Sequence, residues 1–164
     1  MADEILGLFK IISDDVVPQA DTLRELDALI GDGDLGITVT RGMESVVAGL
    51  PDLEGKPVSD QLARSGMAFN RAAASTFGVL FATAMMRGGM AVKGNDAAGI
   101  DDVVPIGRAA MQGLMDRGKA SLGDKTLLDA LDPAINAFEE AHAAGKSLTD
   151  STDAAVDACE VATK

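Results

Sequence analysis

The most informative segment of this 164-residue sequence is Glu25-Leu-Asp-Ala-Leu-Ile-Gly-Asp-Gly-Asp-Leu-Gly-Ile-Thr-Val-Thr-Arg-Gly42. It places three carboxylates, Asp27, Asp32 and Asp34, within eight residues. The glycines between and after these aspartates allow the backbone to turn sharply. Three acidic side chains on one short turn make this segment the first candidate for a functional site.

Apolar residues before the turn predict a helix that leads into it. Leu23, Leu26 and Ile30 would form one face of that helix, which places Asp27 in its last turn. A second helix is predicted to begin near Ile37. Hard oxygen ligands at such a junction suit Mg²⁺, and the free N–H groups at the start of the second helix suit a phosphate. A metal ion beside a phosphate is the chemistry of phosphoryl transfer.

The spacing of the aspartates alone leaves two interpretations open. The carboxylates could bind a metal ion, or they could cap helices and stabilise turns, as aspartates beside glycines often do. An EF-hand fits poorly, because the position that requires glutamate in that loop falls at or beside Met43.

Composition predicts one globular domain with a real core, since 47% of the 164 residues are hydrophobic. No apolar run approaches the roughly 18 residues of a membrane span, and the acidic N-terminus lacks the basic flank of a secretory signal. The single cysteine, Cys159, cannot form an intramolecular disulfide, which fits a cytoplasmic location. A net charge of −12 argues against nucleic acid or an anionic membrane as the main partner.

Hydrophobic spacing of 3.6 residues recurs along the whole chain and predicts an all-α domain of about eight amphipathic helices. We expect them near residues 5–16, 23–30, 37–50, 58–69, 77–92, 102–118, 128–138 and 148–159. Asp102 is predicted to cap the sixth helix, with Pro105 in its first turn and Gly118 at its end. Pro133 either kinks the seventh helix or restarts it after an Asp132 cap. Residues 93–96 are predicted to form a loop.

Two motifs give the sequence a family resemblance. Leu26 to Gly36 resembles the signature Leu-Asp-Ala-x-Ile-Gly-Asp-Gly-Asp-His-Gly of the nucleotide-binding (L) subunit or domain of dihydroxyacetone kinases. The stretch Gly123-Asp-Lys-Thr-Leu-Leu-Asp-Ala-Leu-Asp-Pro-Ala134 matches a second family motif. The resemblance implies an antiparallel barrel of helices over residues 1–164, with the nucleotide at one end. It also implies that Asp27, Asp32 and Asp34 hold two Mg²⁺ ions against the phosphates of ADP or ATP.

The resemblance further implies a set of nucleotide-binding residues, with no catalytic side chain beyond the metal ligands: Leu35, Gly36, Thr38, Ser75, Thr76, Gly78, Gly118 and Leu127. The sequence departs from the family at Leu35, where the family has histidine, and at Ala73 and Ala74, where glycines are usual. Leu35 could simply pack in place of histidine, or its presence could mean a lost phosphate contact.

Ordinary structural roles remain open for several of these positions. The resemblance also places the loop at residues 123–126 beside the nucleotide. Ser75 or Thr76 could instead be plain helix caps, Leu127 could be a core leucine, and Asp124 and Lys125 could be a cap and a surface lysine. The methionines fall on helical faces and are expected to pack in the core. His142 has no partner pattern in the sequence.

The family sequence continues past this point with a Gly-Arg-Ala-Ser-Tyr-Leu-Gly segment and a final helix, whereas this sequence ends at Lys164. The resemblance therefore implies a more open nucleotide site and an exposed apolar seam. We expect the seam to involve Ile5, Leu8 and Phe9, or Val156 and Cys159, and to be covered by self-association or a partner chain.

The resemblance implies a kinase component that binds ADP or ATP with Mg²⁺. It would transfer phosphate to a small ketose such as dihydroxyacetone, held by a separate K-type subunit without which it would be inactive. The phosphate would come from ATP or from a phosphotransferase-system protein. Two alternatives remain: a regulatory or binding protein of the same fold, and a Ca²⁺- or Mg²⁺-binding helical protein unrelated to kinases.

Overall fold

The computed structural model describes residues 2–95 and 97–164, and their side chains from Glu4 onward. This part of the chain contains eight α-helices, two short 3-10 helices and no strand, so the predicted all-α fold is confirmed. Asp96, the last residue of the predicted 93–96 loop, lies outside the described residues. The elements are α1 (Ala2–Val16), η1 (Val17–Gln19), α2 (Ala20–Asp27), α3 (Leu35–Gly49), η2 (Leu50–Leu53), α4 (Val58–Ala72), α5 (Thr76–Ala91), α6 (Ile100–Gly118), α7 (Leu127–Ala143) and α8 (Leu148–Ala162).

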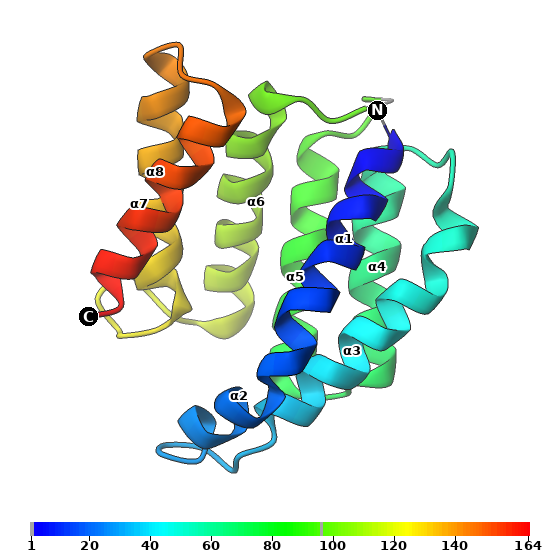
Figure 1. The fold of residues 1–164 in the computed structure, drawn as a ribbon, viewed down its shortest axis with the longest axis vertical. Helices are drawn as coiled ribbons and strands as arrows, with labels where there is room; N and C mark the ends of the chain where they lie inside the picture. The colour runs from blue at the N-terminus through cyan, green and yellow to red at the C-terminus, as the bar shows by residue number, and fades with distance from the viewer. Residues whose placement is uncertain (1, 96) are drawn as a thin grey trace.

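The helices from α3 to α8 pack in the order in which they occur along the chain (Figure 1). Each packs against the next, and the short connections between them make neighbouring helices antiparallel. The helix α1 packs against α3 and α4, and α2 packs against α3. This arrangement places α2 and the aspartate loop at the lower end of the molecule in Figure 1.

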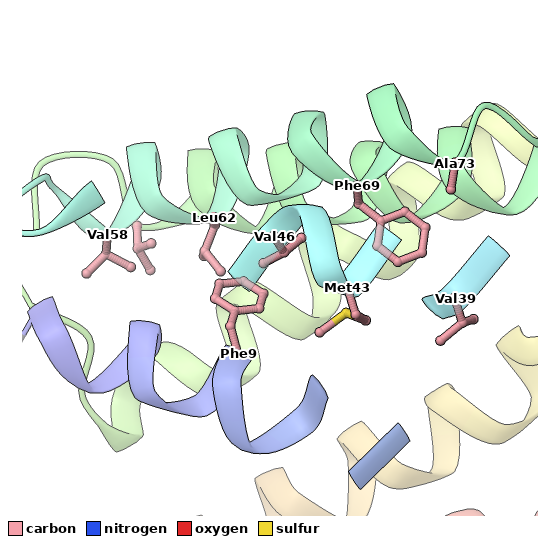
Figure 2. Close-up of a cluster of buried hydrophobic side chains, with 9 residues drawn as sticks. Phe9, Val39, Met43, Val46, Val58, Leu62, Phe69 and Ala73 are labelled. Carbon is pink, nitrogen blue, oxygen red and sulfur yellow. The ribbon is translucent and has the colours of Figure 1, made fainter. Parts of the chain in front are cut away.

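The larger hydrophobic core lies between α1, α3, α4 and α5 (Figure 2). Phe69 of α4 is 1% exposed and its ring contacts those of Phe77 and Phe81, with a centroid distance of 4.4 Å to Phe81. A second cluster forms where α5, α6 and α7 meet, around Leu114 and Leu128. The larger cluster packs α4 against α5, and the turn between these helices lines the candidate site described below.

One predicted apolar face is wrong in part. Leu26 and Ile30 are 57% and 97% exposed, because α2 ends at Asp27 and its periodicity does not extend to Ile30. Leu8 of α1 is more than half exposed, as the predicted seam requires, whereas Phe9, expected in the same seam, is buried. The physical reason is that α1 is covered along one side, by α3 and α4.

The caps of the sixth helix also differ from prediction. Helix α6 begins at Ile100 with Gly99 as its N-cap, and Asp102 is its third residue. The Asp102 carboxylate accepts a hydrogen bond from the Gly99 N–H at 2.8 Å, so it stabilises the helix start from inside. Pro105 consequently lies in the second turn rather than the first. Helix α7 runs through Pro133 without restarting.

The seam expected from the sequence is partly present. Leu8 and Val156 are half exposed, Ile5 and Cys159 are half-buried, and Phe9 is buried against the core. The exposed side of α1 forms an apolar cavity of about 410 Å³ with Met85 of α5 and residues of α6. No helix in the described part of the chain is long and apolar enough to cross a membrane.

Candidate functional site

The three aspartates converge around the loop that joins α2 to α3. One oxygen from each of Asp27, Asp32 and Asp34 lies within 4.8 Å of the other two. Asp27 is half-buried and the other two are exposed, and none has a cationic partner in the described part of the chain. Cis ligands of a Mg²⁺ ion lie about 3 Å apart, so small rotations of these side chains would bring them around one cation. The donor set therefore fits a hard divalent ion.

Backbone contacts orient the aspartates. The Leu35 N–H donates to Asp27 Oδ2, and the Asp34 N–H donates to Asp32 Oδ1, both at 3.3 Å. A Cβ on Gly31 would lie 2.5 Å from Asp27 Oδ1, so the absence of a side chain there leaves room for the carboxylate. Gly33 has a φ of +74°, which glycine adopts without strain.

Two helices begin beside this cluster, and both present free donors. A cavity of about 150 Å³ is lined by Asp34, Ile37 and Thr38 from the start of α3, and by Ser75 and the turn before α5. The N–H groups of Gly36 and Ile37, and those of Thr76 and Phe77, have no acceptor among the residues that the structure describes. Helix N-termini carry partial positive charge and bind phosphates. The N-termini of α3 and α5 both lie beside the carboxylate cluster.

The position of Leu35 supports its packing role. Its side chain is half-buried and packs against the larger core, as a substitute for histidine at that position could do. Ser75 is the N-cap of α5, and its Oγ accepts the Gly78 N–H at 3.0 Å. The Gly78 donor is therefore already used, which leaves the first two N–H groups of α5 for a ligand.

A larger cavity of about 560 Å³ continues from Ser75 and Thr76 to the end of α6, where Gly118 lies. The structure thus brings Asp34, Thr38, Ser75, Thr76 and Gly118 to one end of the molecule, although they come from three separate parts of the chain. Leu127 is 42% exposed and lines neither cavity, and the loop at residues 123–126 does not line them either.

Three polar side chains in these cavities were missed from the sequence. Arg41 lines the smaller cavity, and Asn70 and Arg117 line the larger one. The Asn70 Oδ1 is buried without a hydrogen-bond partner in the described structure. Arg41 follows Thr38 by three residues and so lies near it on α3, and Arg117 directly precedes Gly118. Neither position stands out in the sequence from the other arginines on helices.

The loop before α7 has a structural role that the structure makes plain. Thr126 is the N-cap of α7, while Asp124 accepts the Ser121 N–H and so stabilises the preceding turn instead. Asp129 accepts hydrogen bonds from the N–H groups of Gly123 and Thr126 at 2.5 and 2.7 Å. These backbone donors, the Gly123 N–H foremost, lower the pKa of Asp129 below its usual value.

We expect the Asp129→Asn variant to lose stability in a pH-dependent way. Since the pKa is lower in the folded chain than in the unfolded chain, the carboxylate stabilises the fold above the unfolded pKa, near 3.8. This contribution is lost as the pH falls through the lowered folded value. Urea midpoints should therefore differ most at neutral pH and converge in strong acid. Asp153→Asn, an exposed change on α8, should show no such convergence.

His142 lies far from the aspartates. Its Nε2 is 2.8 Å from Asp101 Oδ1, at the start of α6, whereas Gly118 ends the same helix about 25 Å away. The histidine therefore links α7 to α6 and does not contact the candidate site.

Several known proteins are similar to this chain in sequence. A family model described as the DAK2 domain matches residues 29–164, which include Asp32 and Asp34 and begin just after Asp27. The chain is 28% identical over 144 residues to the Escherichia coli K12 protein "PEP-dependent dihydroxyacetone kinase, ADP-binding subunit DhaL", spanning 88% of this chain and 69% of that protein. It is 32% identical over 120 residues to "PEP-dependent dihydroxyacetone kinase 1, ADP-binding subunit DhaL" of Listeria innocua, spanning 72% of this chain and 59% of that protein.

The fold also matches a solved structure. The crystal structure of the dihydroxyacetone kinase from C. freundii in complex with AMP-PNP and Mg²⁺ aligns with 96% of this chain and 28% of its own, with a TM-score of 0.74. Sequence identity in that alignment is 23%, so the match supports the fold.

Proposed function

We propose, from the premise that this chain belongs to the DAK2 domain family, that it binds ADP or ATP together with Mg²⁺ as one component of a dihydroxyacetone-type kinase. The observation that carries the proposal is the convergence of three carboxylates and two helix N-termini at one end of the molecule. The names of the relatives support it, because the E. coli and Listeria proteins are ADP-binding subunits and the C. freundii structure contains AMP-PNP and Mg²⁺.

Each group in the site has a role in this proposal. Asp27, Asp32 and Asp34 would hold the metal, which when bound neutralises charge on the phosphates during transfer. The N–H groups at the starts of α3 and α5 would bind phosphate oxygens, with Arg41 adding positive charge. The cavity between Asn70 and Gly118 would hold the remainder of the nucleotide.

The test is a calorimetric titration with ADP in the presence and absence of Mg²⁺. We expect ADP to bind at least about tenfold more tightly with the metal, since the carboxylates alone repel the phosphates. Metal binding without ADP binding would favour a metal-binding helical protein unrelated to kinases. No binding of either would leave the proposal without support.

We further propose that the phosphate acceptor, a small ketose, is held by a separate K-type subunit. Among the described residues, the lining of the two cavities includes no histidine, lysine or cysteine. Beyond the aspartate cluster, these cavities therefore offer no side chain of those three types to act as a general base toward a ketose. Whether ATP or a phosphotransferase-system protein supplies the phosphate is a further question for the reconstituted system.

We expect the purified chain to show no turnover of ATP with dihydroxyacetone. A coupled assay for ADP release measures this directly, with a K-type subunit added as the positive control. Sustained ADP release that requires dihydroxyacetone but no second subunit would contradict the proposed division of roles.

A further inference from the structure

The arginines of this chain fall into two groups, those with an ion-pair partner and those without one. Three of the seven arginines, Arg24, Arg87 and Arg108, form ion pairs with carboxylates. The other four have no hydrogen-bond or ion-pair partner among the described residues, although the chain contains 26 acidic residues. All four line cavities: Arg41, Arg64, Arg71 and Arg117.

Arg41 and Arg117 line the two cavities proposed for the nucleotide, where phosphates need positive charge. Arg64 and Arg71 line a different cavity, of about 370 Å³, which lies between α3, η2 and α4 and shares no lining residue with the other two. The two arginines are seven residues apart on α4 and therefore on the same face of the helix. This cavity of α3, η2 and α4 shares one feature with the two cavities proposed for the nucleotide: its lining includes an arginine without an ion-pair partner among the described residues.

A buried hydroxyl in the same cavity is an independent indication of a ligand. Ser65 is 1% exposed and lines this cavity, and its Oγ has no hydrogen-bond partner in the described part of the chain. A serine inside a helix commonly donates to the carbonyl four residues earlier, and Ser65 does not. Buried hydroxyls are normally satisfied, and rotation of this side chain toward the cavity would bring its hydroxyl to a group that enters there.

The remaining lining limits what can bind. Val46, Leu53 and Met67 give the cavity apolar walls, and Asp52 is the one carboxylate among its lining residues. No ion pair joins Asp52 to Arg64. The volume corresponds to about a dozen water molecules, which suits a small organic molecule better than a nucleotide.

We propose that this cavity binds a small organic anion, a phosphate monoester or a carboxylate with a body of a few carbon atoms. Arg64 and Arg71 bind the anionic group, and the Ser65 hydroxyl donates a further hydrogen bond to it. Arginine matches both anions, because its planar guanidinium can donate two parallel hydrogen bonds to paired oxygens. The site goes beyond the proposed nucleotide function and does not depend on it.

The test follows backbone amide signals by NMR during titration with inorganic phosphate, acetate and glycerol 3-phosphate, without Mg²⁺ and at constant ionic strength. We expect shifts at Gly49, Ser65 and Ala68 that saturate below about 10 mM ligand. A response to the two phosphates alone assigns a phosphate site, and a response to acetate assigns a carboxylate site. Absence of a saturable response at these residues overturns the proposal, as does a response confined to the starts of α3 and α5.

Four variants, one of them a control, distinguish a built site from general charge attraction. Arg64→Gln and Arg71→Gln should each weaken binding at least tenfold. Arg87→Gln removes the same charge from a half-exposed ion pair that joins α5 to Asp116 of α6, and should leave binding unchanged. Gly49→Leu should block the cavity, because a Cβ there meets nothing within 4 Å and the fold can accept it. Equal weakening by Arg87→Gln, or undiminished binding to folded Gly49→Leu, overturns the site.

Discussion

Replacing Asp32 or Asp34 with asparagine is expected to weaken ADP binding in the presence of Mg²⁺ by about 100-fold or more. The change keeps the shape of the side chain and removes the negative charge that the cation requires. Neither carboxylate has a cationic partner in the described structure, and both side chains are exposed, so the fold does not depend on them. Without Mg²⁺, the variants should bind ADP no more weakly than the parent chain, because one of the charges that repel the phosphates is gone.

Thermal unfolding should accompany these titrations. We expect the melting temperature of either variant to equal or slightly exceed that of the parent, because one of three mutually repelling charges is gone. Asp157→Asn on α8 is the matched control, with the same charge change far along the chain. If both cluster variants bind Mg-ADP as tightly as the parent, the metal assignment is wrong.

Gly36→Ala is expected to cost about 3 kcal/mol or more in the free energy of unfolding. A Cβ at this position would lie 2.1 Å from the carbonyl oxygen of Ala20, which is backbone at the start of α2. A flexible side chain could rotate away, whereas this oxygen can move only if α2 moves. Since α2 carries Asp27, the displacement should also separate the three carboxylates and weaken Mg²⁺ binding.

Gly7→Ala is the matched control. Gly7 lies inside α1, and a Cβ there meets no atom within 4 Å. Alanine should therefore raise the free energy of unfolding by about 0.5–1 kcal/mol, through helix propensity alone. Urea denaturation of both variants gives the comparison. A Gly36→Ala chain as stable as the parent would show that α2 does not pack on α3 as described.

The existence and order of the helices could be predicted because amphipathic periodicity is a local property of the sequence. The errors arose where packing partners decide the outcome. Phe9 was expected in an exposed seam, but α1 packs against α3 and α4 and Phe9 is buried. Ile30 has the spacing of α2, but the helix has already ended.

The aspartate cluster was predictable for the same reason, since its three members lie within eight residues. The cavities were not, because they form where the α4–α5 turn meets the ends of distant helices. Arg41, Asn70 and Arg117 read in sequence as ordinary polar residues on helices. Only their lack of partners in the folded chain separates the two arginines from the paired ones, and that property has no sequence signal.

The position of α8 has a consequence for local unfolding of the molecule. This helix packs mainly against α7, and the one residue that it buries fully is Ser151. Detaching it exposes little apolar surface, so it should open at a free energy well below that of global unfolding. The rate of amide hydrogen exchange should then be fastest in α8 and slowest in α4 around Phe69. The site end of α3 and α5 lies on the slow side of that gradient, so local opening of α8 can proceed while the proposed nucleotide site stays intact.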